Sequence, residues 1–358
     1  MSNPALDRSI GVHLALGGGA ARGLAHLGVI KALQEHQIPI ASICGTSMGA
    51  LVGACFALNP DAEQVIDDFI HHVNSEKFNK ARFTVIHQVQ KQESRDRRLT
   101  LAARMRHGWL VGRSLTTGSI LSFDEFRSEV SSLIPDRTFK QLKIPFFAVA
   151  CDLLAAREVV FHEGYLRSAI MASSAIPGVF PGVQAGTTVY VDGGWINKIP
   201  TRPPVAFGAP HVIGIDVSDN YTAEFNPRRG YSMLNQANAA SQIRLQELQT
   251  EHADLMWRPP ISVLHWSEFT QIERAVEIGY EYASAHIHEA EALLAPPPKP
   301  TWRERVKQRF FPDPAPKPRF QPGFDARGIW DIQEAEESRL QNQHKTEKID
   351  TAKSITHQ

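Results

Sequence analysis

The sequence predicts an α/β fold with a mainly parallel central sheet, and two observations indicate it. Residues 12–16 (VHLAL) form a short apolar run that ends at three consecutive glycines and is followed by apolar residues at helical spacing. Residues 40–44 (IASIC) repeat the arrangement, with a glycine turn and an apolar helix that stops at Asn59-Pro60. Successive strand–turn–helix units place parallel strands side by side, with helices on the faces of the sheet.

Three further buried strands are expected along the chain, at residues 144–153 (IPFFAVACDL), 187–194 (TTVYVDGG) and 211–218 (HVIGIDVS). Residues 165–181 read as a helix that is broken at Pro177. Residues 231–294 have a helix-rich composition, and residues 234–256 and 273–294 are the two long helical segments predicted there.

Composition places the chain among globular proteins. It has 358 residues, of which 42% are hydrophobic and 21% charged, so it is long enough for one large domain or two ordinary ones. The formal net charge of zero argues against a nucleic-acid-binding protein, because no overall positive potential would attract a polyanion.

Cysteine usage and hydropathy give expectations about the compartment. Cys44, Cys55 and Cys151 lie in apolar runs, and an odd, sparse set is a poor disulfide framework, so a reducing, cytoplasmic location is expected. Residues 1–12 show no secretory signal pattern, and the longest apolar run, residues 48–58, is too short to cross a bilayer. Any membrane contact, for example at the inner membrane face, is therefore expected to be peripheral.

Two segments differ from the rest in composition. Residues 80–113 hold nine Lys or Arg and two acidic residues, which is typical of a solvated helical face; the alternative is a basic cap that meets anionic lipid headgroups. Residues 295–358 begin with a basic, proline-rich linker and end in a polar tail, for which disorder is expected. The domain division that follows is residues 10–294, with a core at 12–218, and residues 295–358.

The turn after the second strand, Gly45-Thr46-Ser47-Met48-Gly49, has the G-x-S-x-G pattern of a nucleophile elbow. Such an elbow needs small residues on both sides because the chain turns sharply from strand to helix and leaves the serine at a strained apex. The N-terminus of the following helix favours negative charge near Ser47. We interpret Ser47 as a nucleophile.

The glycine-rich loop complements this elbow. Gly17, Gly18 and Gly19 follow the first strand, which we expect to neighbour the strand that carries Ser47, and their N–H groups could approach an oxyanion without obstruction. Arg22 could add positive charge or pair with a neighbouring acid. A nucleotide site is the weaker alternative, because the glycine spacing fits neither G-x-G-x-x-G nor the P-loop.

A serine nucleophile needs a base. In α/β-hydrolases a histidine serves, and His211, His252 or His265 could do so here, but no local pattern marks any of them. Asp192 ends a predicted strand and is followed by Gly193 and Gly194, which leave space around its carboxyl group. An aspartate before glycine is also common in ordinary turns, so the residues alone leave the base open.

Taken together, GGGAARG (17–23), GTSMG (45–49), ASSAIPGVFPGV (172–183) and DGG (192–194) resemble the patatin-like phospholipases, and so does GLAHLGVIKALQE (23–35). The resemblance spans residues 12–218 and, more faintly, the helices up to residue 294. It implies a three-layer α/β/α sandwich and a Ser47–Asp192 dyad without histidine. The loop Gly17–Gly19 would form the oxyanion hole, and Arg22, Gly45, Gly49, Gly193 and Gly194 would support the site.

The function implied by the resemblance is hydrolysis of carboxylic ester bonds in phospholipids or lysophospholipids, with a lipid substrate and without a metal or cofactor. Two alternatives remain: a histidine-dependent esterase of the α/β-hydrolase kind, and a lipid-binding or regulatory protein that keeps the fold without turnover. Intact Ser47, Asp192 and loop glycines argue against the last, because a binding scaffold needs none of them. Headgroup preference and oligomeric state are not encoded in any motif.

Overall fold

The computed structural model describes residues 11–80, 119–218, 228, 230–295 and 325–329. Its centre is a nine-stranded sheet in which the strand order is β5-β6-β3-β2-β1-β7-β8, with β4 paired to β3 and β9 to β4. The strands are β1 (Val12–Leu16), β2 (Ile40–Thr46), β3 (Phe146–Asp152), β4 (Arg157–Gly164), β5 (Val183–Ala185), β6 (Thr188–Asp192), β7 (Val212–Ile215), β8 (Leu255–Trp257) and β9 (Asp325–Ile329).

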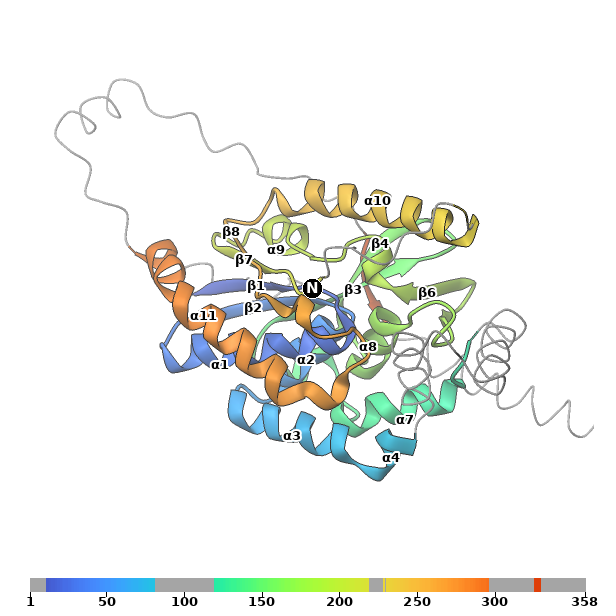
Figure 1. Cartoon of the computed structure of the whole chain (residues 1–358), viewed down its shortest axis with the longest axis horizontal. Helices are drawn as coiled ribbons and strands as arrows, with labels where there is room; N and C mark the ends of the chain where they lie inside the picture. The colour runs from blue at the N-terminus through green and yellow to red at the C-terminus, as the bar shows by residue number, and fades with distance from the viewer. Residues whose placement is uncertain (1–10, 81–118, 219–227, 229, 296–324, 330–358) are drawn as a thin grey trace, which may run out of the picture.

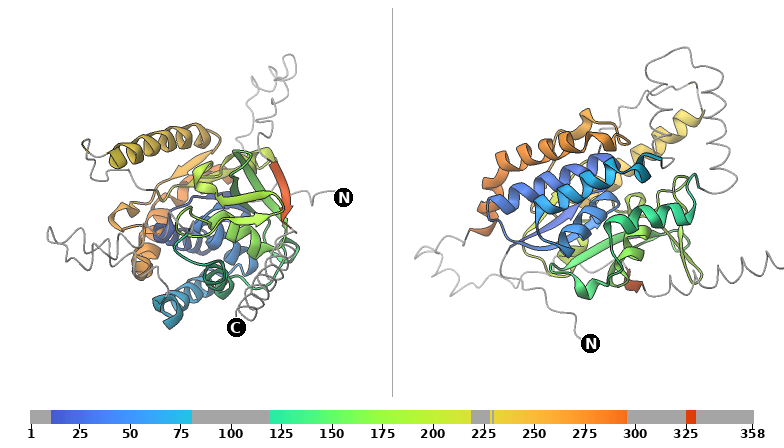
Figure 2. Two further views of the ribbon diagram at one scale, coloured as in Figure 1. Left: turned by 90° about the vertical axis from the view of Figure 1, so that its right-hand side faces the viewer. Right: turned by 90° about the horizontal axis from the view of Figure 1, so that it is seen from below.

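Helices cover both faces of this sheet, which makes a three-layer α/β/α sandwich (Figure 1). One face carries α1 (Ala25–Glu35), α2 (Met48–Leu58), α3 (Ala62–Asn74), α7 (Phe123–Leu133), α8 (Leu166–Ser174) and α11 (Ile272–Leu294), and this layer faces the viewer in the right-hand view of Figure 2. The short α4 (Glu76–Lys80) follows α3. The opposite face carries α9 (Arg202–Ala206) and α10 (Gly230–Thr250).

The parallel half of the sheet confirms the expectation from the two glycine turns. Strand β1 lies between β2 and β7, and all three run in the same direction, as do β2 with β3 and β7 with β8. The carboxyl ends of β1 and β2, which carry the glycine loop and Ser47, are therefore neighbours at one edge of the sheet.

Strand β3 explains how Asp192 reaches the same place. Strand β4 pairs along residues 148–152 of β3, so β2 and β6 must share the other side of β3. The β2 ladder ends at Thr46 opposite Val149, and the antiparallel β6 ends at Asp192 opposite Ala150. The two strands thus meet end to end beside consecutive residues of β3, and Ser47 and Asp192 come together where they meet.

Three sequence expectations need correction. The strand expected at residues 187–194 is β6, which is shorter and runs antiparallel to β3. The helix expected at 234–256 ends at Thr250, because residues 255–257 pair with β7 as β8 and bury Trp257. The strand expected at 211–218 stops at Ile215, and a loop follows it.

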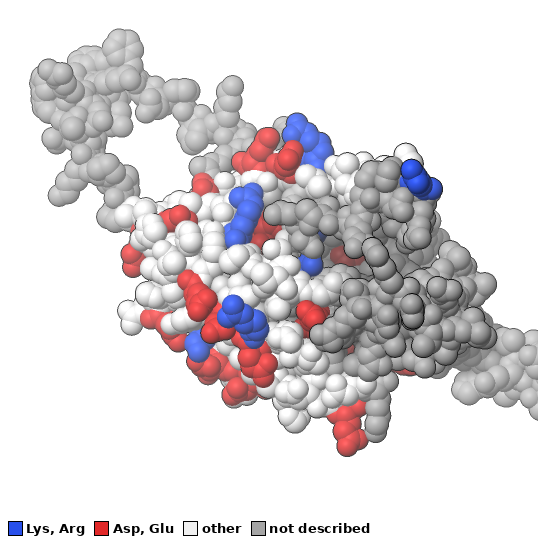
Figure 3. Space-filling model, viewed as in Figure 1, with Lys and Arg blue, Asp and Glu red and all other residues white. Residues whose placement is uncertain are grey.

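In the view of Figure 3, acidic and basic side chains are mixed in small groups, and wide uncharged areas lie between the groups. The basic segment 80–113 lies almost wholly outside the described residues, and so do residues 296–324 and 330–358. Residues 325–329, within the expected linker and tail, instead form β9 and pair with β4, so this short part of the segment belongs to the sheet. Within the ranges described above, no helix combines the length and the apolar character that crossing a bilayer requires.

Candidate active site

Ser47 occupies a strained turn between β2 and α2. Its backbone has φ 57° and ψ −124°, a conformation that residues with side chains rarely adopt. The flanking glycines make the turn possible. A Cβ added to Gly45 would lie 2.5 Å from the Cα of Ala50, and one added to Gly49 would lie 2.2 Å from the carbonyl oxygen of Leu16. Both positions therefore require glycine, as the elbow pattern predicts.

The hydroxyl group of Ser47 donates a hydrogen bond directly to the carboxylate of Asp192. The distance from Oγ to Oδ2 is 2.6 Å, and both residues are buried, with 7% and 5% of their surface exposed. The other carboxylate oxygen, Oδ1, accepts from the N–H of Gly194 at 2.7 Å. A Cβ on Gly193 would lie 2.3 Å from the carbonyl oxygen of Val149, so this glycine lets the turn after β6 lie against β3.

Burial controls the electrostatics of this pair. It raises the pKa of Asp192 to about 6, against the opposing effects of the hydrogen bonds from Ser47 and Gly194 and of the positive charge of Lys198. The carboxylate is therefore ionised at neutral pH, but it is a stronger base than an exposed aspartate. That is the property a general base needs.

Ser173, on α8, holds the backbone of the nucleophile. The N–H of Ser47 donates to Ser173 Oγ at 3.0 Å, and this hydroxyl donates to the carbonyl oxygen of Val149 on β3 at 2.6 Å. Ser173 is completely buried. No local pattern around Ser173 marks this role, because the contact joins residues 126 positions apart.

The three glycines of the loop do not present equivalent N–H groups. Gly17 donates to the carbonyl oxygen of Ile215 at 3.0 Å, and Gly18 donates to that of Lys198 at 2.9 Å. Among the described residues, no acceptor faces the N–H of Gly19. Gly18 lies directly against the nucleophile, since a Cβ there would be 3.2 Å from the Cβ of Ser47. Of the three, Gly19 is thus the glycine whose N–H is available to a ligand.

Arg22 serves to anchor the short helix that follows the loop. Its Nε donates to the carbonyl oxygen of Leu264 at 2.8 Å, and the N–H of the preceding Ala21 donates to the carbonyl oxygen of Trp266 at 2.8 Å. The side chain is buried, at 8% exposed. These contacts tie the glycine loop to the segment that precedes α11.

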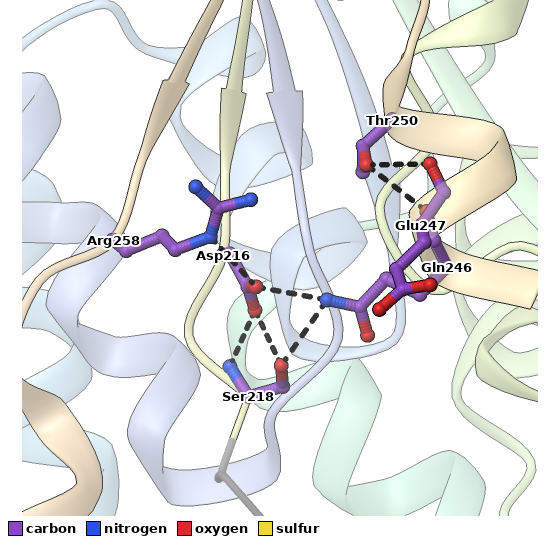
Figure 4. Close-up of polar contacts among 6 residues, drawn as sticks. All are labelled: Asp216, Ser218, Gln246, Glu247, Thr250 and Arg258. Atoms are coloured by element: carbon purple, nitrogen blue, oxygen red, sulfur yellow. Dashed lines mark hydrogen bonds and ion pairs between the residues drawn. The ribbon is translucent and has the colours of Figure 1, made fainter. Parts of the chain in front are cut away.

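A polar cluster fixes the neighbouring loop, which follows β7 (Figure 4). One carboxylate oxygen of Asp216 accepts from the N–H and the hydroxyl of Ser218. The other accepts from Gln246 Nε2 on α10 at 2.8 Å and lies 3.6 Å from Nε of Arg258. The loop after β7 packs against the glycine loop, since a Cβ added to Gly19 would lie 2.7 Å from Cγ2 of Val217.

An apolar pocket opens beside Ser47, with a volume of about 110 Å³. Its walls come from α2, α3, α7 and the segments around them, and its apolar lining consists of Ala20, Leu24, Met48, Leu51, Phe69, Val73, Phe78, Leu121, Phe126, Val130, Leu133, Ile176, Phe180 and Phe269. His72 and Glu129 also line it, and burial lowers the pKa of the first to about 4 and raises that of the second, which disfavours charge on both. The pocket is suited to an aliphatic chain.

The histidines considered as alternative bases are not hydrogen-bonded to the nucleophile. The hydroxyl of Ser47 is engaged by Asp192, and no histidine of the described residues is hydrogen-bonded to it. His265, for example, pairs its Nδ1 with Ser267. Within the same part of the chain, no group of three or more His, Cys, Asp or Glu side chains is placed to bind a metal ion.

The chain is similar in sequence to several known proteins. The chain is 34% identical over 242 residues to an uncharacterized NTE family protein of Mycobacterium tuberculosis, covering 64% of this chain and 59% of that one. It is 32% identical over 208 residues to lysophospholipase NTE1 of Mycosarcoma maydis, covering 58% of this chain and 10% of the relative. The chain thus spans less than two thirds of the length of these relatives.

Among solved structures, VipD from Legionella pneumophila matches with a TM-score of 0.42 and 17% identity, over 80% of this chain and 67% of that one. The profile of the family described as patatin-like phospholipase matches residues 14–205, which is more than half of the chain and includes both Ser47 and Asp192. The chain therefore belongs to the patatin-like phospholipase family.

Proposed function

We propose that this protein is a lipid acyl hydrolase that cleaves carboxylic ester bonds of phospholipids or lysophospholipids, with residues 10–294 as its catalytic unit. The observation that carries the proposal is the 2.6 Å hydrogen bond from Ser47 to Asp192 beside an apolar pocket. The fungal relative described as a lysophospholipase supports the choice of substrate class.

In the proposed first step, Ser47 Oγ attacks the ester carbonyl carbon while Asp192 accepts the hydroxyl proton. The tetrahedral intermediate then collapses, the carbon–oxygen bond to the glycerol part breaks, and the leaving alcohol takes the proton from Asp192. In the second step, Asp192 removes a proton from water, which attacks the acyl carbon. The bond between that carbon and Ser47 Oγ then breaks, Ser47 Oγ takes the proton back from Asp192, and the fatty acid is released. Positioned proton transfer of this kind contributes roughly 10²–10⁴-fold to a rate.

The negative charge that develops on the carbonyl oxygen needs hydrogen-bond donors. We assign this role to the N–H of Gly19 and to the N-terminal turn of α2, which begins at Met48 directly after the nucleophile. Gly17 and Gly18, whose N–H groups donate to backbone carbonyls, then shape the loop rather than bind the oxyanion.

The apolar pocket would hold the acyl chain, because it begins at Ser47 and presents almost only carbon atoms. The polar headgroup would remain outside it. Since phospholipids reside in bilayers, the proposal implies a transient, peripheral contact with a membrane surface.

The direct test is fatty-acid release from phosphatidylcholine vesicles and from lysophosphatidylcholine, comparing the intact protein with Ser47→Ala and Asp192→Asn. We expect release by the intact protein and a loss of at least about 10³-fold in both variants, with the circular dichroism spectrum unchanged. Loss in Ser47→Ala alone would mean that another group is the base. Absence of release by the intact protein from both lipids would contradict the proposal.

A further inference from the structure

His26, near the start of α1, is completely buried and faces the glycine loop. Its Nε2 lies 2.7 Å from the carbonyl oxygen of Gly17. A carbonyl oxygen only accepts hydrogen bonds, so Nε2 must carry the proton. Burial lowers the pKa of His26 to about 4, against the raising effects of this hydrogen bond and of the charge of Asp216. The ring is therefore neutral, with Nδ1 unprotonated.

The other ring nitrogen, Nδ1, shows that a histidine has a cost at this position. Within the described residues, Nδ1 of His26 is buried and has no hydrogen-bond partner. A buried acceptor without a partner is unfavourable, whereas an aliphatic side chain of similar size would fill the same space without that cost. The favourable polar contact of this imidazole is thus its single hydrogen bond to Gly17.

That hydrogen bond fixes one particular peptide group. The peptide between Gly17 and Gly18 has its C=O bound by His26 and its N–H bound by the carbonyl oxygen of Lys198 at 2.9 Å. Glycines present little steric barrier to rotation of a peptide, so these two contacts set its orientation. The Cα of Gly18 follows this peptide along the chain and lies against Ser47. The next peptide group carries the N–H of Gly19.

We propose that His26 is a positioning residue: by holding the Gly17–Gly18 peptide, it aims the N–H of Gly19 at the carbonyl oxygen of an ester bound at Ser47. The inference rests on the proposed hydrolase function and deepens it. Loss of the Nε2–H donor leaves the carbonyl of Gly17 without its partner and allows the peptide to turn, which displaces the oxyanion donor.

The chain offers a matched control in His13 on β1. His13 is 1% exposed, its Nδ1 pairs with Ser42 Oγ at 2.7 Å, its Nε2 is buried without a partner, and burial likewise lowers its pKa to about 4. It lies four residues before Gly17, about 13 Å away along the strand. Replacing either histidine therefore removes one buried hydrogen bond, but only His26 contacts the loop.

The experiment compares His26→Leu, His26→Gln and His13→Leu. The glutamine keeps an N–H donor near the position of Nε2, and His26→Met replaces the leucine variant if that one does not fold. For each protein we would measure the melting temperature, kcat and KM for a soluble p-nitrophenyl ester, and the rate of inactivation by a fluorophosphonate, whose P=O oxygen needs the same donor.

We expect kcat to fall about 10- to 100-fold in His26→Leu, with KM within about twofold and fluorophosphonate inactivation slowed by a similar factor. His26→Gln should recover kcat to within about fivefold of the intact protein, and His13→Leu should lower the melting temperature while keeping kcat. Wild-type kcat in folded His26→Leu, or an equal loss of kcat in His13→Leu, would overturn the inference.

Hydrogen–deuterium exchange separates this inference from the proposed function. Peptides that cover residues 17–24 should exchange faster in His26→Leu than in the intact protein, and should be unchanged in His13→Leu. If the intact protein hydrolyses no ester, the hydrolase proposal fails, and this exchange comparison still decides whether His26 holds the loop: unchanged exchange in His26→Leu would refute it.

Discussion

Replacing Asp192 with asparagine should make the protein more stable while it abolishes activity. The carboxylate is 5% exposed, and burial raises its pKa to about 6 from an ordinary value of 3.8. Asparagine keeps an oxygen that can accept from Gly194, and its amide can donate to the hydroxyl of Ser47, which rotates to accept. The substitution therefore removes a buried charge without emptying the site.

The size of the effect follows from the pKa shift. A shift of about two units corresponds to about 3 kcal/mol, at about 1.4 kcal/mol per unit. Because the folded-state pKa is raised, the folded protein holds the proton more tightly than the unfolded chain. The stability of the wild type is therefore highest, as far as this group is concerned, below pH 3.8 and decreases as pH rises through about 6.

Urea unfolding followed by circular dichroism tests this reasoning. Asp192→Asn should exceed the wild type by up to about 3 kcal/mol in the free energy of unfolding at about pH 8, and by about half as much at about pH 5. A variant that is less stable than the wild type at about pH 8, or a stability difference that does not change with pH, would refute the view that burial of its charge makes Asp192 unfavourable to the fold.

Three further outcomes are expected. The value of kcat/KM for a soluble ester should fall about tenfold per pH unit below about pH 6 and be constant above it, because only ionised Asp192 accepts the proton. A midpoint near 3.8, the ordinary pKa of aspartate, would contradict the view that burial raises the pKa of this base. Gly49→Ala should lower the free energy of unfolding by about 1–3 kcal/mol in urea titrations, because its Cβ would lie 2.2 Å from a carbonyl oxygen, whereas Gly230→Ala, with nothing within 4 Å, should not lower it. Leu51→Trp, which fills the pocket, should lower kcat/KM for long-chain p-nitrophenyl esters at least about tenfold relative to short-chain ones, and an unchanged chain-length profile would place the acyl chain elsewhere.

The parallel half of the fold could be predicted from sequence because its signals are local. Apolar runs of five residues, glycine turns and helical spacing of apolar residues each lie within about twenty residues of one another, and β1, β2, α1 and α2 appear where they were expected. Strand β8 was mistaken for the end of a helix, since only its pairing with β7 makes residues 255–257 extended. The direction of β6 likewise depends on its partner β3.

The site residues could be predicted from the sequence only in part. The G-x-S-x-G pattern marked Ser47 because a strained turn admits few alternatives to glycine, and a Cβ at Gly45 or Gly49 would clash with neighbouring backbone. Asp192 was singled out by the family resemblance, because an aspartate before glycine is also common in ordinary turns. Ser173 and His26 were not found, because an internal serine or histidine carries no pattern that separates a structural contact from a supporting one.

Sequence alone determined where the sharp turn at Ser47 and the glycine loop lie, since backbone strain and the absence of side chains are properties of short segments. Tertiary structure decided what these residues do for each other. The ends of β2 and β6 meet on one side of β3, which places Ser47 and Asp192 within 2.6 Å across 145 residues of chain. Tertiary structure also decided which glycine N–H groups are engaged. The N–H groups of Gly17 and Gly18 donate to the carbonyl groups of Ile215 and Lys198, which only the assembled fold brings beside the loop, and the N–H of Gly19 is left available.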